Sequence, residues 1–196
     1  MLGKYTILCG FIALLATSCD SNNSTEQKEA PRATPVNVVA HGVLDSVLTQ
    51  YALVQNKLVD WDSAGAKTQA LALDSLLGKL EPEALTKVDT LVPQIGELLA
   101  AVKGEVKSIQ KETTLTEQRR SFYTLSSALQ ELLVQTGYNA KKVYVGHCPM
   151  AFNDEEEAKW LSLTNDVVNP YLGNKHPIYK AGMLHCGEIV DSLGSK

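Results

Sequence analysis

Aliphatic side chains recur every three or four residues through most of the stretch from 36 to 138. This spacing places them along one face of an α-helix, where they can be buried against neighbouring helices. Four such segments follow one another, beginning near residue 36, near residue 64, at Pro82 and at Thr114. Because the polar turns between them are short, neighbouring helices should pack side by side in opposite directions. The pattern therefore predicts an all-α fold whose main part is an antiparallel four-helix bundle.

Residues typical of helix ends support these boundaries. Asp62 or Ser63 can cap the second helix, and "TLTE" at 114–117 has the spacing of a capping box. Gly137 can adopt the left-handed conformation that often ends a helix. Pro93 lies inside the third segment and has no backbone N–H, so we expect either a kink there or two shorter helices.

The helical spacing ends near residue 140. "KVYVG" at 142–146 is rich in β-branched and aromatic residues in alternation, which predicts a short strand. "NDEEEAKWLSL" at 153–163 starts with residues that cap helices and continues with carboxylates, which a helix N-terminus favours. We therefore predict a short helix there, followed by a turn-rich loop at 169–182. Together these segments should form a small irregular C-terminal subdomain.

The first residues predict export and lipidation. Lys4 precedes an apolar run, "YTILCGFIALLA", that has the length of a secretory signal and is too short to span a bilayer. "LLATSC" at 14–19 resembles a bacterial lipobox, in which cleavage before Cys19 leaves a cysteine that carries acyl chains such as palmitate. An ordinary signal peptide with an incidental Cys19 is the alternative. We therefore expect a signal peptide (1–18), a flexible tether (19–35) and one helical domain (36–196), lipid-anchored in the cell envelope, facing the periplasm or on the outer membrane.

Charge and motifs narrow the class of function. The net charge of the whole chain is −4 at pH 7, and no basic stripe of the kind that binds nucleic acid occurs in the sequence. Contact with the membrane should therefore come from the lipid anchor alone. The sequence also contains no glycine-rich phosphate loop and no nucleophile with a recognisable base. We expect a binding protein rather than an enzyme.

Two sulfur-containing motifs mirror each other within residues 142–190. "GHCPMA" at 146–151 and "GMLHCG" at 182–187 contain glycine, histidine, cysteine and methionine in opposite order. The candidate metal ligands are His147, Cys148, Met150, Met183 and Cys186. Thiolate and thioether sulfur, together with imidazole, select Cu(I) over harder divalent ions. The paired C-x2-C spacing typical of structural zinc sites does not occur, so this donor set favours copper.

The same two cysteines also suit a disulfide. Cys148 and Cys186 would pair by default in an oxidising compartment. The bridge would close a loop of about 38 residues and stabilise the fold by up to about 4 kcal/mol in the chain-entropy model. Methionines beside such a bridge would fill gaps in a small core. Spacing alone favours the disulfide over the metal, and both hypotheses stay open.

The stretch "HCPMAFND…WLSLTNDVVNPYLG…MLHCGEIV" resembles the C-terminal signature of the DUF3347 family. The segment "TEQRRSFYTLSSALQELL" resembles a helix of that family. The residues that stand at matching positions are Gln118, Arg119, Phe122 and Ser126. The family comprises secreted proteins and lipoproteins. Its domain also occurs fused to, or encoded near, periplasmic adaptors of heavy-metal efflux systems of the CusB type. The resemblance covers about 40–190 and departs from the family pattern in a longer loop at 174–182.

This resemblance implies a role with copper or a related cation. The five candidate ligands match motif positions of the family and carry over, whereas His185 does not. We therefore expect a lipid-anchored envelope protein that binds Cu(I) as an accessory to metal efflux or resistance, with a heavy-metal efflux adaptor as its partner. The competing hypothesis is a non-metal interaction module in which Cys148 and Cys186 form a structural disulfide.

Overall fold

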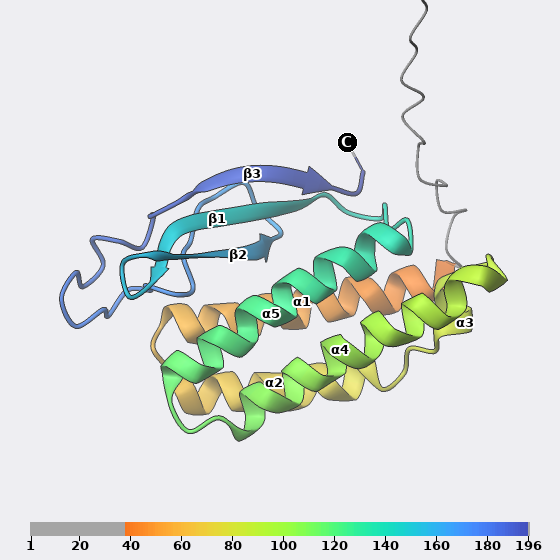
Figure 1. Ribbon diagram of the computed structural model, residues 1–196, viewed down its shortest axis with the longest axis horizontal. Helices are drawn as coiled ribbons and strands as arrows, with labels where there is room; N and C mark the ends of the chain where they lie inside the picture. The colour runs from red at the N-terminus through yellow and green to blue at the C-terminus, as the bar shows by residue number, and fades with distance from the viewer. Residues whose placement is uncertain (1–37, 196) are drawn as a thin grey trace, which may run out of the picture. The chain divides into compact units, whose positions relative to one another are not determined.

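The computed structural model describes residues 38–195. The expected signal peptide, the lipidated Cys19 and the tether lie outside the described residues. Five α-helices and a small three-stranded antiparallel sheet make up the regular structure of the described part (Figure 1). The all-α class is therefore wrong, because the C-terminal part forms a sheet rather than one strand and one helix.

The helices occupy the first two thirds of the described chain. Their bounds are α1 (Val38–Val59), α2 (Ser63–Leu77), α3 (Pro82–Leu85), the 3-10 helix η1 (Asp89–Leu91), α4 (Val92–Lys111) and α5 (Leu115–Gln135). The strands are β1 (Val143–Phe152), β2 (Glu156–Ser162) and β3 (Glu188–Leu193), in the spatial order β2-β1-β3. Among the described helices, none is both long and apolar enough to cross a bilayer.

The predicted helix ends are confirmed. The Asp62 carboxylate accepts a hydrogen bond from the Gly65 N–H at 2.8 Å. The Thr114 hydroxyl accepts from the Glu117 N–H, and the Glu117 carboxylate accepts from the Thr114 N–H, which is the reciprocal capping box. Gly137 follows α5 with a φ of +64°. Pro93 occupies the first turn of α4, where no backbone N–H is needed, so the third segment forms separate helices instead of a kinked one.

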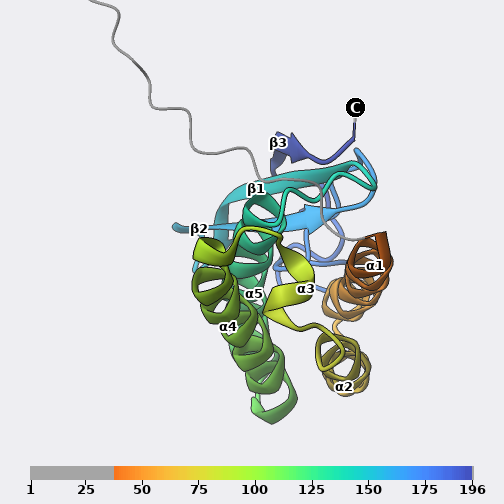
Figure 2. The same ribbon diagram turned by 90° about the vertical axis from the view of Figure 1, so that its right-hand side faces the viewer.

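The helices pack in sequence and support the sheet. Helix α1 packs on α2, α2 on α4, and α4 on α5. The sheet lies over α1 and α5 in both views (Figures 1 and 2). Because α1 and α5 contact each other only sparsely, the antiparallel four-helix bundle stays a prediction.

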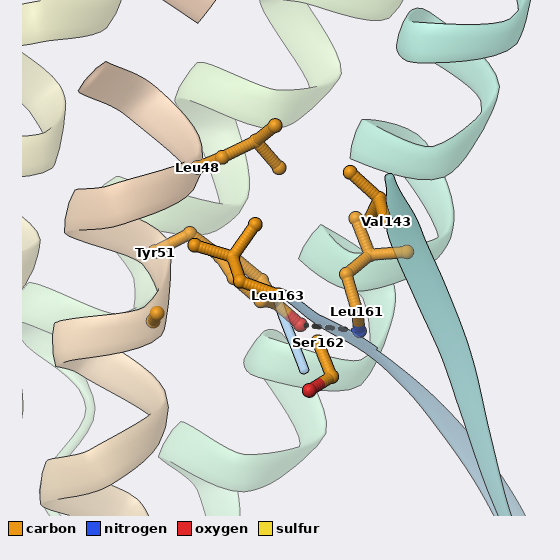
Figure 3. A pocket seen from close by; sticks show the side chains of 7 residues that line it. Leu48, Tyr51, Val143, Leu161, Ser162 and Leu163 are labelled. Atoms are coloured by element: carbon orange, nitrogen blue, oxygen red, sulfur yellow. Dashed lines mark hydrogen bonds between the residues drawn. The ribbon is translucent and has the colours of Figure 1, made fainter. Parts of the chain in front are cut away.

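A tyrosine joins α1, α5 and the sheet. Tyr51 is fully buried in α1, and its hydroxyl lies 2.6 Å from the Ser126 hydroxyl of α5. The same oxygen accepts a hydrogen bond from the Leu161 N–H of β2 at 3.1 Å (Figure 3). The crevice beside it, lined by Leu48 and Val143 among others, has no room for a water molecule. It is therefore a packed junction and not a ligand site.

The helix predicted for 154–163 is wrong. Asn153 and Asp154 both have positive φ, of 52° and 61°, and the Glu155 N–H donates to the Phe152 carbonyl at 3.1 Å. This is the geometry of a tight turn between antiparallel strands, and an acidic run after it begins β2. Strand β3 was not predicted, because most of its side chains are exposed and carry no alternating apolar pattern.

Candidate functional site

Antiparallel pairing brings the two mirrored motifs together. In the ladder between β1 and β3, His147 lies opposite Glu188, so residues that follow His147 meet residues that precede Glu188. The Sγ atoms of Cys148 and Cys186 consequently lie 3.2 Å apart, with no bond between them. In two antiparallel strands, residues that come later in one strand lie opposite residues that come earlier in the other. The mirrored order of the motifs therefore lets like residues, such as Cys148 and Cys186, lie side by side.

The glycines of both motifs border one indole ring. Gly146 pairs directly with Trp160 of β2, and a Cβ on Gly146 would lie 2.2 Å from Cε2 of that ring. Gly187 has a φ of +119°, and a Cβ there would lie 2.3 Å from the His147 carbonyl oxygen and 3.2 Å from the indole. Trp160 is fully buried. Each glycine thus permits a close approach that no other residue allows, and the cysteines beside them are held in register.

Asn169 fixes the loop that carries the second motif. It is fully buried, its side-chain NH2 donates to the Cys186 carbonyl at 2.9 Å, and its backbone N–H donates to the Leu184 carbonyl at 2.8 Å. Its side-chain oxygen accepts from the N–H groups of Tyr171 and Leu172. Asn169 therefore acts as a turn and packing residue.

The methionines of the two motifs are partly buried, as Cys186 is. Met183 and Cys186 share one turn, in which the Cys186 N–H donates to the Met183 carbonyl at 3.0 Å. Met150 lies two residues after Cys148 in β1, where an irregular register interrupts the ladder with β2. Met150 and Met183 are partly buried and pack against the hydrophobic core, which includes the fully buried Cys148. The two motifs thus contribute four sulfur atoms, two from cysteines and two from methionines.

The histidines of the motifs point elsewhere. Successive side chains of a strand lie on opposite faces, so His147 shares its face with Lys159 and not with Cys148. The His147 Nε2 lies 3.0 Å from a carboxylate oxygen of Glu157. His185 directs Nδ1 to the Val167 carbonyl oxygen at 2.6 Å. The structure therefore does not bring His147 to the sulfur pair.

The Cys186 thiol is protonated at neutral pH. Burial, together with the neighbouring Cys148 thiol, raises the pKa of Cys186 to about 11. Within residues 38–195 no three side chains of His, Cys, Asp or Glu converge in a way that could hold a metal. A metal at this place would therefore depend on the two thiolates with the two thioethers, which is the donor set of a soft cation.

Residues 47–141 match the family model described as "Protein of unknown function (DUF3347)", and the chain belongs to this family. No curated protein and no solved structure matches the chain. The matched residues extend from α1 to the segment just before β1, so they include Gln118, Arg119, Phe122 and Ser126, all of which are buried on α5. The sheet with both sulfur motifs lies outside them. The candidate ligands therefore stand on their geometry alone.

Proposed function

We propose that this protein is a lipid-anchored accessory protein of the cell envelope that binds a soft cation, Cu(I), through Cys148, Cys186, Met150 and Met183. The observation that carries the proposal is the 3.2 Å separation of two cysteine sulfurs that are 38 residues apart in the chain. Both methionines of the same motifs are partly buried and pack against the same core. Sulfur ligands favour Cu(I) over the harder cations that are more abundant in water.

Binding at this site is coupled to protons. Because burial raises the pKa of Cys186, a metal must displace protons from the thiols before it is bound as a thiolate complex. The affinity for Cu(I) should therefore rise as the pH rises towards the pKa of Cys186. His147 lies on the other face of the sheet, so we leave it out of the ligand set.

The second candidate function is an interaction module stapled by a disulfide. Two thiolates that share a metal at about 2.3 Å each would hold their sulfurs about 3.8 Å apart in a tetrahedral site. The observed 3.2 Å is shorter and needs only a small shift to reach the bond length of about 2.05 Å. A bridge across this loop would stabilise the fold by about 4 kcal/mol in the chain-entropy model.

A competition titration with a chromogenic Cu(I) chelator separates the two functions. The full chain, purified in detergent, is titrated as isolated and again after reduction. The copper hypothesis predicts one tightly bound ion after reduction, lost in the double variant Met150→Ala with Met183→Ala. His147→Ala is the matched control and should bind as the wild type does. If the reduced chain takes no copper from the chelator, the metal function is wrong and the disulfide-stapled module is favoured.

The anchor and the partner remain proposals with their own tests. Mass spectrometry of the mature N-terminus should find acyl chains on Cys19, and Cys19→Ala should abolish this modification. An unmodified Cys19 in the mature protein, or a mature N-terminus at another residue, would contradict lipidation. Crosslinking in cells to a heavy-metal efflux adaptor tests the expected partner.

A further inference from the structure

A second site lies at the start of α5, apart from the sulfur pair. A pocket of about 430 Å³ opens there between the end of α1, the β1–β2 turn and the loop around His176. Its walls include Trp61, Phe152, Tyr171 and Ile178, and Arg119 also lines it. This volume is within the range that small organic ligands occupy, and mostly apolar walls with a few polar groups are typical of such sites.

The charge of Arg119 is buried without an acidic partner. The side chain is 4% exposed, and its guanidinium donates to the carbonyls of Pro170 at 2.9 Å and Leu58 at 2.8 Å. Among the residues that the structure describes, it forms no ion pair. Burial lowers the pKa of Arg119 to about 10, which still leaves it charged at neutral pH. A buried charge without a counter-ion is costly, so an anion that enters this pocket has a strong electrostatic reason to stay.

The adjacent arginine shows the contrast. Arg120 is exposed and binds the Glu156 carboxylate through two parallel hydrogen bonds of 2.9 and 3.0 Å. Its guanidinium also lies over the Phe152 ring. Within the described residues, the solvent-exposed Arg120 thus has a carboxylate partner, whereas the buried Arg119 has none. Arg120 is therefore a matched control for Arg119.

His176 adds an uncharged donor to the same pocket. Its Nδ1 accepts hydrogen bonds from the N–H groups of Ile178 and Tyr179, at 3.3 and 3.2 Å. Nδ1 therefore carries no proton, and the neutral ring holds its proton on Nε2. Burial first, and the charge of Arg119 second, lower the pKa of His176, so the ring is neutral at pH 7.

The backbone is strained at one residue of the pocket wall, Trp61, whose φ is +60°. Four non-glycine residues among the described ones have positive φ, and three of them, Trp61, Asn153 and Asp154, line this pocket. A bulky residue such as Trp61 rarely adopts this conformation. Its ring is nevertheless held 4.2 Å from the Arg119 guanidinium, and its N–H donates to the Leu172 carbonyl at 2.9 Å. The strain thus serves to place an aromatic wall against the buried charge.

We propose that this pocket binds a small organic carboxylate with an apolar or aromatic body. The carboxylate pairs with Arg119 and accepts the Nε2–H of His176, while the body packs on Trp61, Phe152 and Ile178. Asp154 also lines the pocket, but it is exposed and already accepts a hydrogen bond from the Tyr179 hydroxyl at 3.1 Å. Solvent screens its charge, so it does not cancel that of Arg119.

Calorimetry with a matched pair of probes tests the site. The full chain in detergent is titrated with 3-phenylpropanoate and with its neutral amide, 3-phenylpropanamide. We expect the acid to bind at least about tenfold more tightly than the amide, since a hydrogen-bonded charge pair is lost in the amide. Arg119→Gln should remove this preference. Arg120→Gln should keep it, and this variant also controls for uptake of the probes by micelles.

A third variant keeps the test valid if Arg119→Gln fails to fold. Ile178 is 73% exposed at the pocket wall, so Ile178→Trp should fold normally and reduce binding of the acid at least tenfold by filling the space. The proposal is overturned if acid and amide bind equally, or if neither binds up to about 10 mM. It is also overturned if inorganic phosphate binds as tightly as the acid, because the site would then select charge alone. None of these outcomes depends on copper binding.

Discussion

Replacing Gly146 by alanine should damage the sheet at its most constrained point. A Cβ at this position would lie 2.2 Å from Cε2, 2.4 Å from Cζ2 and 2.7 Å from Nε1 of Trp160. The indole is fully buried and pairs across the strand with Gly146, so it has no room to withdraw. Adding atoms to a close-packed interior forces side chains or backbone to shift, which costs about 1–3 kcal/mol. We expect the free energy of unfolding of Gly146→Ala to fall by about 3 kcal/mol, at the top of this range.

A double-mutant cycle assigns this loss to the indole. Trp160→Phe removes Cζ2 and Nε1, so Gly146→Ala should cost at least about 1 kcal/mol less in the Trp160→Phe chain than in the wild type. Urea unfolding followed by circular dichroism measures all four proteins without using tryptophan as the reporter.

A second glycine serves as the control. Gly104 lies inside α4, and a Cβ there would have no neighbour within 4 Å. Gly104→Ala should therefore stabilise the protein by about 0.4–1 kcal/mol. The reasoning fails if the free energy of unfolding of Gly146→Ala lies within about 0.5 kcal/mol of the wild-type value, which is the usual limit of additivity. It also fails if Gly146→Ala costs the same free energy of unfolding with tryptophan and with phenylalanine at position 160.

Three further predictions concern other parts of the chain. Tyr51→Phe leaves the buried Leu161 N–H without its acceptor and should lower the free energy of unfolding by about 1–3 kcal/mol in urea titrations. Thr114→Ala removes the helix cap of α5 and should cost about 0.5–2 kcal/mol, whereas an unchanged unfolding midpoint would contradict the cap. The pKa of Cys186 is raised to about 11 in the folded protein, so the unfolded thiol releases its proton first. The reduced protein should therefore lose stability between pH 9 and 11 relative to Cys186→Ala, and an equal pH dependence of the two would refute the raised pKa.

The helices could be predicted because their signals are local. The aliphatic spacing, the Thr114 and Glu117 capping box and Gly137 all act within a few residues, and the structure shows each where it was expected. Pro93 was correctly expected to interrupt its segment. Tertiary packing then decided how these helices meet, and no local signal carried that information.

The strand predicted at 142–146 forms part of β1, but the rest of the sheet was missed although two signals for it were present. Asn153 and Asp154 form the tight turn between β1 and β2, and both residue types tolerate positive φ. The acidic run after them, however, equally suits the start of a helix. The mirrored order of the two motifs was also a sign of antiparallel pairing. Strand β3 itself is exposed and lacks a pattern, so only its partner reveals it.

The two sites differ in how far the sequence could indicate them. Cys148 and Cys186 were expected to meet, and their sulfurs do lie in contact. Nothing in the sequence indicated that Arg119 would be buried against carbonyls from Leu58 and Pro170, which are 61 and 51 residues away. His176 likewise gains its role only because its loop folds over the end of α1. Long-range packing of this kind produces no periodic pattern in the sequence.

X-ray absorption at the copper edge tests the central claim most directly. The full chain is reduced, loaded with one equivalent of Cu(I) and measured beside His147→Ala. A single site formed by both motifs predicts a first coordination shell of sulfur atoms alone, identical in the two proteins, because His147 lies on the other face of the sheet. Imidazole nitrogen in that shell, or a spectrum that changes in His147→Ala, would contradict the site described above.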